Sequence, residues 1–76
     1  MSPAKTLPPG STIGILGGGQ LGRMTALAAA RLGYRCIIYA PEDHSIAGDV
    51  AAGHVSGAYA DQAALRRFAA QVDVIT

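Results

Sequence analysis

Four short apolar runs divide the chain, and their composition predicts β-strands. Residues 12–16 and 35–39 are rich in β-branched and aromatic side chains, and a glycine or a proline follows soon after each run. Runs of roughly four to eight such residues are typical of buried strands. Shorter runs at 54–57 and 73–76 predict a third and a fourth strand. The continuous apolarity of 35–39 also predicts that this strand is buried on both faces.

Between the first two predicted strands, apolar residues recur with a helical period over residues 20–32. An apolar stripe on a helix is normally the face that packs on the core, so we expect these side chains to lie against the sheet. The stripe consists of Leu21, Met24, Ala28 and Leu32, with Leu27 beside it. Gly33 follows directly, where the end of a helix favours a residue in the left-handed conformation.

A second helix is predicted after Asp61, a residue type that is well suited to cap a helix N-terminus. The two arginines of this helix, Arg66 and Arg67, are expected to face outward. Its apolar residues recur at helical spacing, and they are Leu65, Phe68, Ala69 and Val72. Residues 41–53, which precede the third predicted strand, contain proline and glycine and are expected to be loop-like or weakly helical.

The elements follow one another in the order β-α-β-β-α-β, which predicts an α/β fold with a parallel sheet and helices on its faces. This is the order of one Rossmann-like half of a doubly wound parallel sheet. We assign the proline-containing residues 1–11 to a flexible leader and residues 12–76 to a single domain. Because the last predicted strand ends at Thr76 without a cap, we expect a truncated N-terminal domain of a longer protein.

Composition and charge narrow the classes of partner. Hydrophobic residues make up 50% and charged residues 14% of the 76 residues, which is typical of a folded domain. The net charge of +1 gives no reason to expect nucleic acid or an anionic membrane as a partner. No apolar run approaches the roughly 20 residues of a membrane span, and no secretory signal is present, so we expect a cytoplasmic protein. The single cysteine, Cys36, is expected to be a small buried apolar residue.

The stretch "GILGGGQLGRM" places Gly17, Gly19 and Gly22 at G-x-G-x-x-G spacing, after a predicted strand and at the start of a predicted helix. In such loops the first glycine allows a tight turn, and the last lets the helix lie close to the strand. Gly18 and Gly19 have no Cβ, so a ligand can approach the backbone. The free N–H groups and the dipole at the helix start favour an anion. The loop therefore predicts a nucleotide site, although a turn without a ligand stays an alternative.

Nicotinamide-dependent enzymes share this glycine spacing, and they remain one interpretation. Their fold carries an Asp or Glu about 20 residues further on, at the end of the second strand, to bind the ribose 2′-OH. Here that place holds Ala40, and Glu42 and Asp43 come only after a proline. Gln20, in the first turn of the predicted helix, offers instead an amide that can bond to a ribose hydroxyl or a base edge.

The sequence shows no catalytic constellation and no metal-ligand spacing. His44 and His54 have no cysteine or histidine pair near them at the spacing of a zinc site, and they are expected to be ordinary polar residues. No serine has a partner pattern for nucleophilic catalysis. We therefore assign no catalytic residue and no metal ligand to this chain, and we expect it to be inactive on its own.

Three pieces of sequence together carry a family resemblance: "GGGQLGRM", the helix that follows Asp61, and "DVIT" at 73–76. Over residues 12–76 the chain closely resembles the start of the N5-carboxyaminoimidazole ribonucleotide synthetases, a family of the ATP-grasp superfamily. The resemblance implies a pre-ATP-grasp domain. It also implies an ATP-dependent ligase of purine biosynthesis, which carboxylates 5-aminoimidazole ribonucleotide with bicarbonate that has been activated as carboxyphosphate.

The resemblance also implies where the ligands bind. ATP and Mg²⁺ are bound by domains not present in this chain, and the N-terminal domain supplies part of the pocket for the ribonucleotide. Carried over residue by residue, this implies that Gly18, Gly19, Gln20 and Leu21 bind that substrate, Gln20 through its side-chain amide and Leu21 through its backbone N–H. Many members of the family have Asp where this chain has Ala40. The full-length protein is expected to be a homodimer.

Three classes of function stay open on the sequence. The first is the ATP-dependent ligase, the second an NAD(P)-dependent oxidoreductase, and the third a stand-alone nucleotide-binding module without catalysis. The related formate-dependent glycinamide ribonucleotide transformylases usually have Glu at the position of Gln20, so this glutamine favours the carboxylating enzymes.

Overall fold

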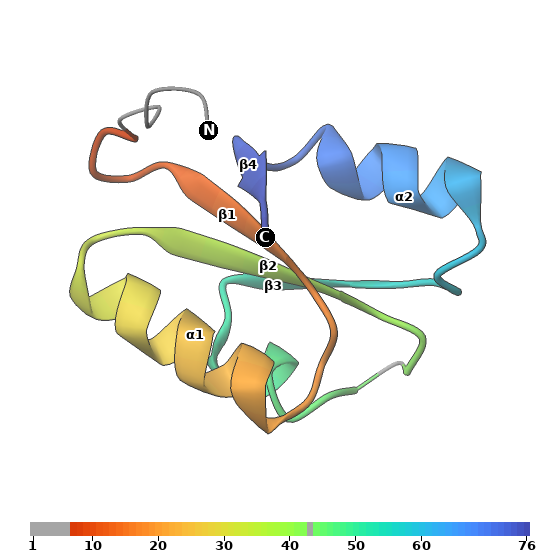
Figure 1. Cartoon of the computed structure of the whole chain (residues 1–76), viewed down its shortest axis with the longest axis horizontal. Coiled ribbons are helices and arrows are strands. Elements are labelled where there is room, and N and C mark those ends of the chain that lie inside the picture. Colours follow the sequence, from red (N-terminus) through yellow and green to blue (C-terminus); the bar gives the residue numbers. More distant parts are fainter. Residues whose placement is uncertain (1–6, 43) are drawn as a thin grey trace.

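A four-stranded parallel sheet with the strand order β3-β2-β1-β4 organises the chain (Figure 1). The computed structural model describes residues 7–42 and 44–76. The strands are β1 (Thr12–Leu16), β2 (Arg35–Ala40), β3 (Gly53–Ser56) and β4 (Val74–Ile75). The predicted α/β class and the Rossmann-like half of a doubly wound sheet are thereby confirmed.

The central strand β1 pairs in parallel with β2 on one side and with β4 on the other. Along the β1–β2 ladder, Thr12 lies opposite Arg35 and Leu16 lies opposite Tyr39. Because all strands run the same way, their carboxyl ends meet at one edge of the sheet. Ligands of open α/β sheets bind outside this edge.

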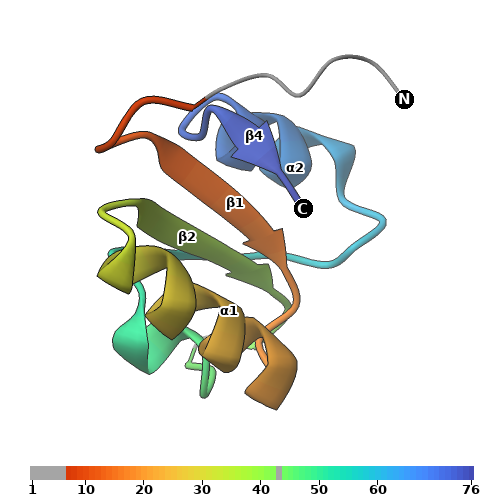
Figure 2. The same cartoon turned by 60° about the vertical axis from the view of Figure 1, so that its left-hand side comes forward.

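The helix α1 (Gln20–Arg31) covers one face of the sheet (Figure 2). Its small side chains make the contact. Ala26 and Ala29 are its buried residues, and they share a hydrophobic core with Ile15 and Ile38. A helix that packs through alanine lies closer to a sheet than one that packs through leucine. The approach of α1 is therefore set by its smallest residues.

The predicted packing face of α1 is wrong for this reason. Leu21, Met24 and Leu32 are 78%, 63% and 71% exposed, and Ala28 is exposed as well. Their stripe points away from the sheet, because the alanine face already fills the space against it. Gly33, as predicted, ends the helix with a φ of 89°.

The helix α2 (Gln62–Ala69) covers the opposite face of the sheet (Figures 1 and 2). Asp61 caps it as predicted, since its carboxylate accepts a hydrogen bond of 3.0 Å from the Ala64 N–H. The buried Phe68 ring packs on Gly14, where a Cβ would lie 2.7 Å from the ring. Ala69, which was expected on the apolar face, is exposed.

The strand β2 contributes to a core on each face, as its continuous apolarity predicted. Cys36 and Ile38 belong to the core beneath α1, whereas Tyr39 belongs to the core beneath α2. The rings of Tyr39 and Phe68 are tilted against each other with their centroids 5.3 Å apart. Cys36 is the small buried residue that the sequence predicted.

Two connecting segments complete the described chain. Between β2 and β3, residues 41–42 and 44–52 form bends, turns and the short 3-10 helix η1 (Gly48–Val50). Residues 7–11 of the predicted leader are hydrogen-bonded to the domain, because the Gly10 N–H donates to the Gly33 carbonyl over 2.8 Å and the Tyr34 hydroxyl donates to the Leu7 carbonyl. Residues 1–6 lie outside the described residues. No helix within 7–42 and 44–76 is long and apolar enough to cross a membrane.

Replacing the buried ring and an exposed leucine tests which side chains form the core. Phe68→Ala should lower the free energy of unfolding by about 3–5 kcal/mol, because it removes a fully buried aromatic side chain. Leu32→Ala should change it by no more than about 0.5 kcal/mol, because that side chain is largely exposed. Urea unfolding followed by circular dichroism measures the free energy of unfolding of both variants and of the wild type. A loss at Leu32 as large as that at Phe68 would contradict the outward orientation of the stripe.

The buried thiol of Cys36 should make stability fall at alkaline pH. Burial raises the pKa of this thiol above its ordinary value of 9.0. The unfolded chain therefore loses the thiol proton at a lower pH than the folded chain, and the free energy of unfolding decreases as the pH rises above about 9. Urea midpoints at pH 7.5 and pH 10 should differ less for Cys36→Ala than for the wild type. Equal differences in the two proteins would show that the thiol carries no pH dependence.

Candidate functional site

The loop that joins β1 to α1 leaves the carboxyl end of the central strand through Gly17. This residue has a φ of 117°, in the left-handed region that favours glycine. Its N–H donates to the Tyr39 carbonyl over 2.8 Å, which extends the contact between β1 and β2 by one residue. The predicted role of Gly17 in a tight turn is confirmed.

Gly22 brings the first turn of α1 against this loop. A Cβ on Gly22 would lie only 2.8 Å from the carbonyl oxygen of Gly17, which is backbone and cannot rotate away. The prediction that Gly22 lets the helix lie close to the strand is confirmed. Its consequence is that the helix N-terminus stands directly beside the end of the sheet.

Gly18 and Gly19 have different surroundings, which the sequence did not predict. A Cβ on Gly18 would meet the Cβ of Ser45 at 2.5 Å and the Cβ of Ala40 at 3.1 Å, so Gly18 is packed on its own chain. A Cβ on Gly19 would have no atom within 4 Å. Close packing on its own chain is therefore a reason for glycine at position 18, whereas the Cβ position of Gly19 is open. That a ligand approaches the backbone of these two glycines stays a prediction.

The backbone at the start of α1 presents unpaired donors. The N–H groups of Gly18, Gly19, Gln20 and Leu21 find no acceptor among residues 7–42 and 44–76. No side chain of the described residues caps the helix there, and no acidic residue lies in its first turn. Free amides and the positive end of the helix dipole together favour an anionic or strongly accepting ligand.

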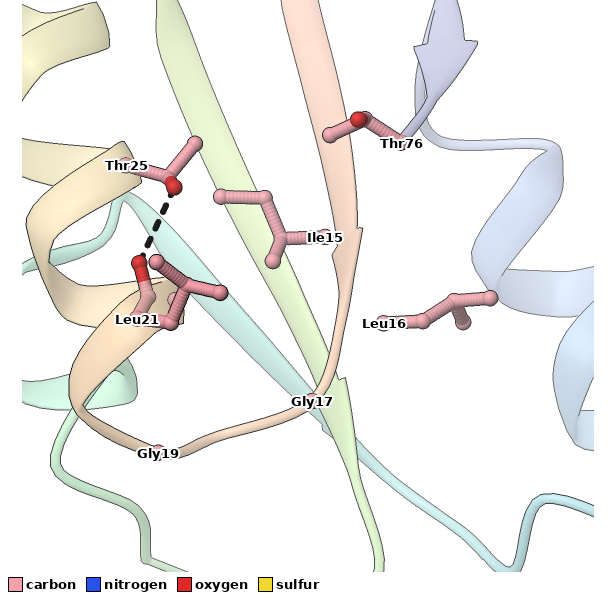
Figure 3. Close-up of a pocket in the computed structure, with 8 residues that line it drawn as sticks. Ile15, Leu16, Gly17, Gly19, Leu21, Thr25 and Thr76 are labelled. Carbon is pink, nitrogen blue, oxygen red and sulfur yellow. Dashed lines mark hydrogen bonds between the residues drawn. The ribbon is translucent and has the colours of Figure 1, made fainter.

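A cleft of about 310 Å³ lies beside the loop, between α1 and the segment that follows β4 (Figure 3). Ile15 forms its floor, Leu21 and Thr25 stand on the helix side, and Thr76 stands on the opposite side. The Thr25 hydroxyl donates to the Leu21 carbonyl over 2.9 Å, so its hydrogen is turned back to the helix. The other lining residues are Leu16, Gly17, Gly19 and Gly22.

The four residues predicted to bind substrate divide into two pairs. Gly19 and Leu21 line the cleft, and Leu21 offers both its side chain and its N–H. Gly18 is turned towards Ser45, and Gln20 is exposed beside the cleft and makes no side-chain hydrogen bond with the described residues. The substrate-binding role of these residues stays a prediction.

The sequence did not indicate the position of three residues near the loop. Ser45 and Ala47 are buried against the loop, although their segment was expected to be an irregular connection. Tyr59 places its hydroxyl 3.9 Å from the Cβ position of Gly17, and its ring lies against Tyr39 with centroids 6.0 Å apart. No periodicity marks these residues, since each lies in a loop that another element positions.

The phenol of Tyr39 is fixed beneath this edge of the sheet. Its hydroxyl donates to the Ala58 carbonyl over 2.6 Å. Burial, aided by the nearby carboxylate of Asp61, raises the pKa of Tyr39 above its ordinary value. Tyr39 is therefore a neutral structural group and not a candidate acid or base near neutral pH.

The end of β2 does not offer the acidic group that a nicotinamide-binding fold requires. Ala40 is fully buried and its methyl group faces Gly18. Glu42 is exposed, and its backbone carbonyl accepts a hydrogen bond from Ser56. Asp43 lies outside the described residues. This geometry disfavours the oxidoreductase interpretation, because the ribose-binding carboxylate has no place at this position.

The histidines do not converge. His44 is exposed in the segment after β2, and His54 lies in β3, where its Nδ1 is 3.4 Å from the Ser56 hydroxyl. The His54 Nε2 is buried and has no partner among the described residues. Within 7–42 and 44–76, no group of three His, Cys, Asp or Glu side chains could hold a metal ion.

Comparison with known proteins gives a family match. A family model described as "Ribonucleotide synthetase preATP-grasp domain" matches residues 10–76. The N5-carboxyaminoimidazole ribonucleotide synthase of Brucella melitensis is 56% identical over 71 residues, which cover 93% of this chain and 20% of that protein. The bifunctional purine synthesis protein purC/E of Dictyostelium discoideum is 56% identical over 73 residues, which cover 96% of this chain and 7% of that protein.

Similarity to a solved structure leads to the same family as these relatives. The structure of N5-carboxyaminoimidazole synthetase from Staphylococcus aureus, complexed with ADP, is 40% identical to this chain and matches it with a TM-score of 0.88. The match covers 92% of this chain and 19% of that protein. The chain thus spans about a fifth of the length of these two synthases.

A methyl group added at Gly22 should disturb the junction of loop and helix. Gly22→Ala should lower the free energy of unfolding by about 1–3 kcal/mol, because the Gly17 carbonyl cannot move away from the added atom. Gly53→Ala is the matched control, since its nearest contact would be an ordinary 3.5 Å from the Ile37 side chain. It should be neutral or stabilising by up to about 1 kcal/mol. Urea midpoints compare the two, and equal losses would argue against a special constraint at Gly22.

Proposed function

Because the chain belongs to the ribonucleotide synthetase preATP-grasp domain family, we propose that it is the substrate-binding N-terminal segment of an ATP-dependent carbon–nitrogen ligase. The proposed reaction carboxylates 5-aminoimidazole ribonucleotide with bicarbonate to N5-carboxyaminoimidazole ribonucleotide in purine biosynthesis. The observation that carries this proposal is the 56% identity to a synthase of that name over 93% of the chain, glycine loop included.

The proposed chemistry needs two partial reactions. The terminal phosphoryl group of ATP passes to bicarbonate, which gives ADP and carboxyphosphate. The exocyclic amine of the ribonucleotide then attacks the carboxyl carbon, and phosphate leaves. We expect ATP and Mg²⁺ to bind outside residues 1–76, as the family resemblance implies. The ADP complex of the Staphylococcus aureus relative supports a nucleotide-dependent reaction.

The part that this chain plays is to bind and orient the ribonucleotide. Gly19 and Leu21 line the cleft, and their N–H groups have no acceptor among the described residues. Such N–H groups suit the oxygen atoms of a phosphoribosyl group. The exposed side chain of Gln20 makes no hydrogen bond with a described residue, so its amide is free to turn towards a ligand seated there. The cleft volume of about 310 Å³ is at the lower end of the range for small-molecule sites. We infer that residues outside this chain complete the pocket.

Removing the Gln20 amide tests this assignment in the full-length protein. Gln20→Ala should raise the KM for 5-aminoimidazole ribonucleotide about threefold to tenfold, which is the effect of losing one hydrogen bond. The KM for ATP should stay unchanged, because ATP is expected to bind elsewhere. Gln62→Ala is the matched control, since Gln62 is likewise the exposed first residue of its helix. Steady-state release of phosphate gives the KM values of the wild type and of both variants.

Two results would contradict the proposal. Binding of NAD by calorimetry, with no response to the ribonucleotide, would support the oxidoreductase interpretation. Binding of a nucleotide without bicarbonate-dependent phosphate release would support a module without catalysis. An equal rise of the ribonucleotide KM in Gln20→Ala and Gln62→Ala would remove Gln20 from the site while leaving the reaction in place.

A further inference from the structure

The turn over residues 45–48 holds the glycine loop from its inner side. The Ala47 N–H donates to the Gly18 carbonyl over 3.1 Å. The Ser45 side chain occupies the place where any side chain on Gly18 would go, with its Cβ 2.5 Å and its Oγ 2.8 Å from that Cβ position. One hydrogen bond and one close packing contact thus fix the orientation of Gly18.

This contact determines where the next amide points. The chain has no cis peptide bond among the described residues, so the carbonyl of Gly18 and the N–H of Gly19 lie on opposite sides of one planar peptide. Because the carbonyl points to Ala47, the Gly19 N–H points away from the turn. Gly19 is exposed, lines the cleft and has no described acceptor for its N–H.

The turn is itself well braced. The Ser45 hydroxyl oxygen accepts a 3.0 Å hydrogen bond from the Gly48 N–H, and the Ser45 carbonyl accepts one of 3.2 Å from the Asp49 N–H. Ser45 is only 8% exposed and Ala47 is fully buried. His54 closes the turn from the side of β3, because its ring would lie 2.7 Å from a Cβ on Gly48. A rigid support of this kind can hold a peptide group in one orientation.

We propose that Ser45 and Ala47 are positioning residues, which hold the Gly18–Gly19 peptide so that the Gly19 N–H donates to an anionic oxygen of the bound ribonucleotide. This inference rests on the proposed function for the identity of the ligand. It assigns Gly18 a role that the glycine spacing alone does not give. Because Gly18 has no side chain, the turn can pack directly against it, and this contact orients the neighbouring Gly19 amide towards the ligand.

A pair of compensating substitutions in the full-length protein tests the proposal. Gly18→Ala should raise the KM for 5-aminoimidazole ribonucleotide about tenfold, which corresponds to one misplaced charge-assisted hydrogen bond. The KM for ATP should not change. In Gly18→Ala/Ser45→Gly the added methyl group takes the space of the removed side chain, with the Ala40 Cβ at 3.1 Å as the remaining close contact. This double variant should return to within about threefold of the wild-type KM.

Two further proteins separate positioning from stability. Ser45→Ala keeps the Cβ but removes the oxygen that accepts from Gly48, and it should raise the ribonucleotide KM by about threefold without a clash. Gly53→Ala is the matched glycine control and should leave both KM values unchanged. All proteins are assayed at a temperature below their thermal unfolding midpoints, so that each is folded. A wild-type KM in Gly18→Ala, or a double variant no better than that single variant, would overturn the proposal.

A measurement without turnover distinguishes this inference from the proposed function. In glycine-¹⁵N-labelled protein, the Gly19 amide resonance should shift when 5-aminoimidazole ribonucleotide is added, and the shift should be lost in Gly18→Ala. If that pattern appears without carboxylation, the proposed reaction fails and the positioning role stands. If carboxylation proceeds and the Gly19 amide does not respond, the positioning role fails and the proposed reaction stands.

Discussion

The inner side of the loop between β1 and α1 has no room for side chains, and the rest of the structure follows from this constraint. Gly22 meets a backbone carbonyl and Gly18 meets the turn at Ser45. With the start of α1 held this close, the residues that the helix buries against the sheet further along are alanines, Ala26 and Ala29. The larger apolar residues of α1 must then face away. The first amides of the helix, which have no partner within the helix, are thereby placed at the open edge of the sheet.

The strands and their order were predictable because local composition determines them. Short β-branched runs separated by helical periods leave few ways to build a parallel sheet. The packing face of α1 was not predictable from apolar size, because the distance between helix and sheet decides which side chains fit. The informative signal was the series Gly22, Ala26 and Ala29, small residues at helical spacing on one face. A stripe of leucines is a packing face only where the helix is held far enough from its neighbour.

The candidate site was likewise predictable from the sequence only in part. The glycine spacing identified the loop and the roles of Gly17 and Gly22, since both depend on residues next to them in the chain. It did not identify the partner of Gly18, because Ser45 comes from a distant segment without a periodic pattern. On the proposed function, this domain presents amides and a floor for the ribonucleotide, and the remainder of the protein brings ATP. Binding and chemistry would thus be divided between parts of one polypeptide, a common arrangement for sites built on α/β sheets.

The bond between Ala47 and Gly18 joins two segments that are far apart in the sequence. The amides of the loop are consequently in place only after β2 has docked on β1 and the turn has closed. A ligand that needs those amides binds the folded chain and not the unfolded one, so its binding energy adds to the stability of the whole first half of the domain. Bound substrate would then stabilise the folded state of the segment that recognises it. Fluctuations of the turn would lower the affinity for substrate without any change in the residues that contact the ligand.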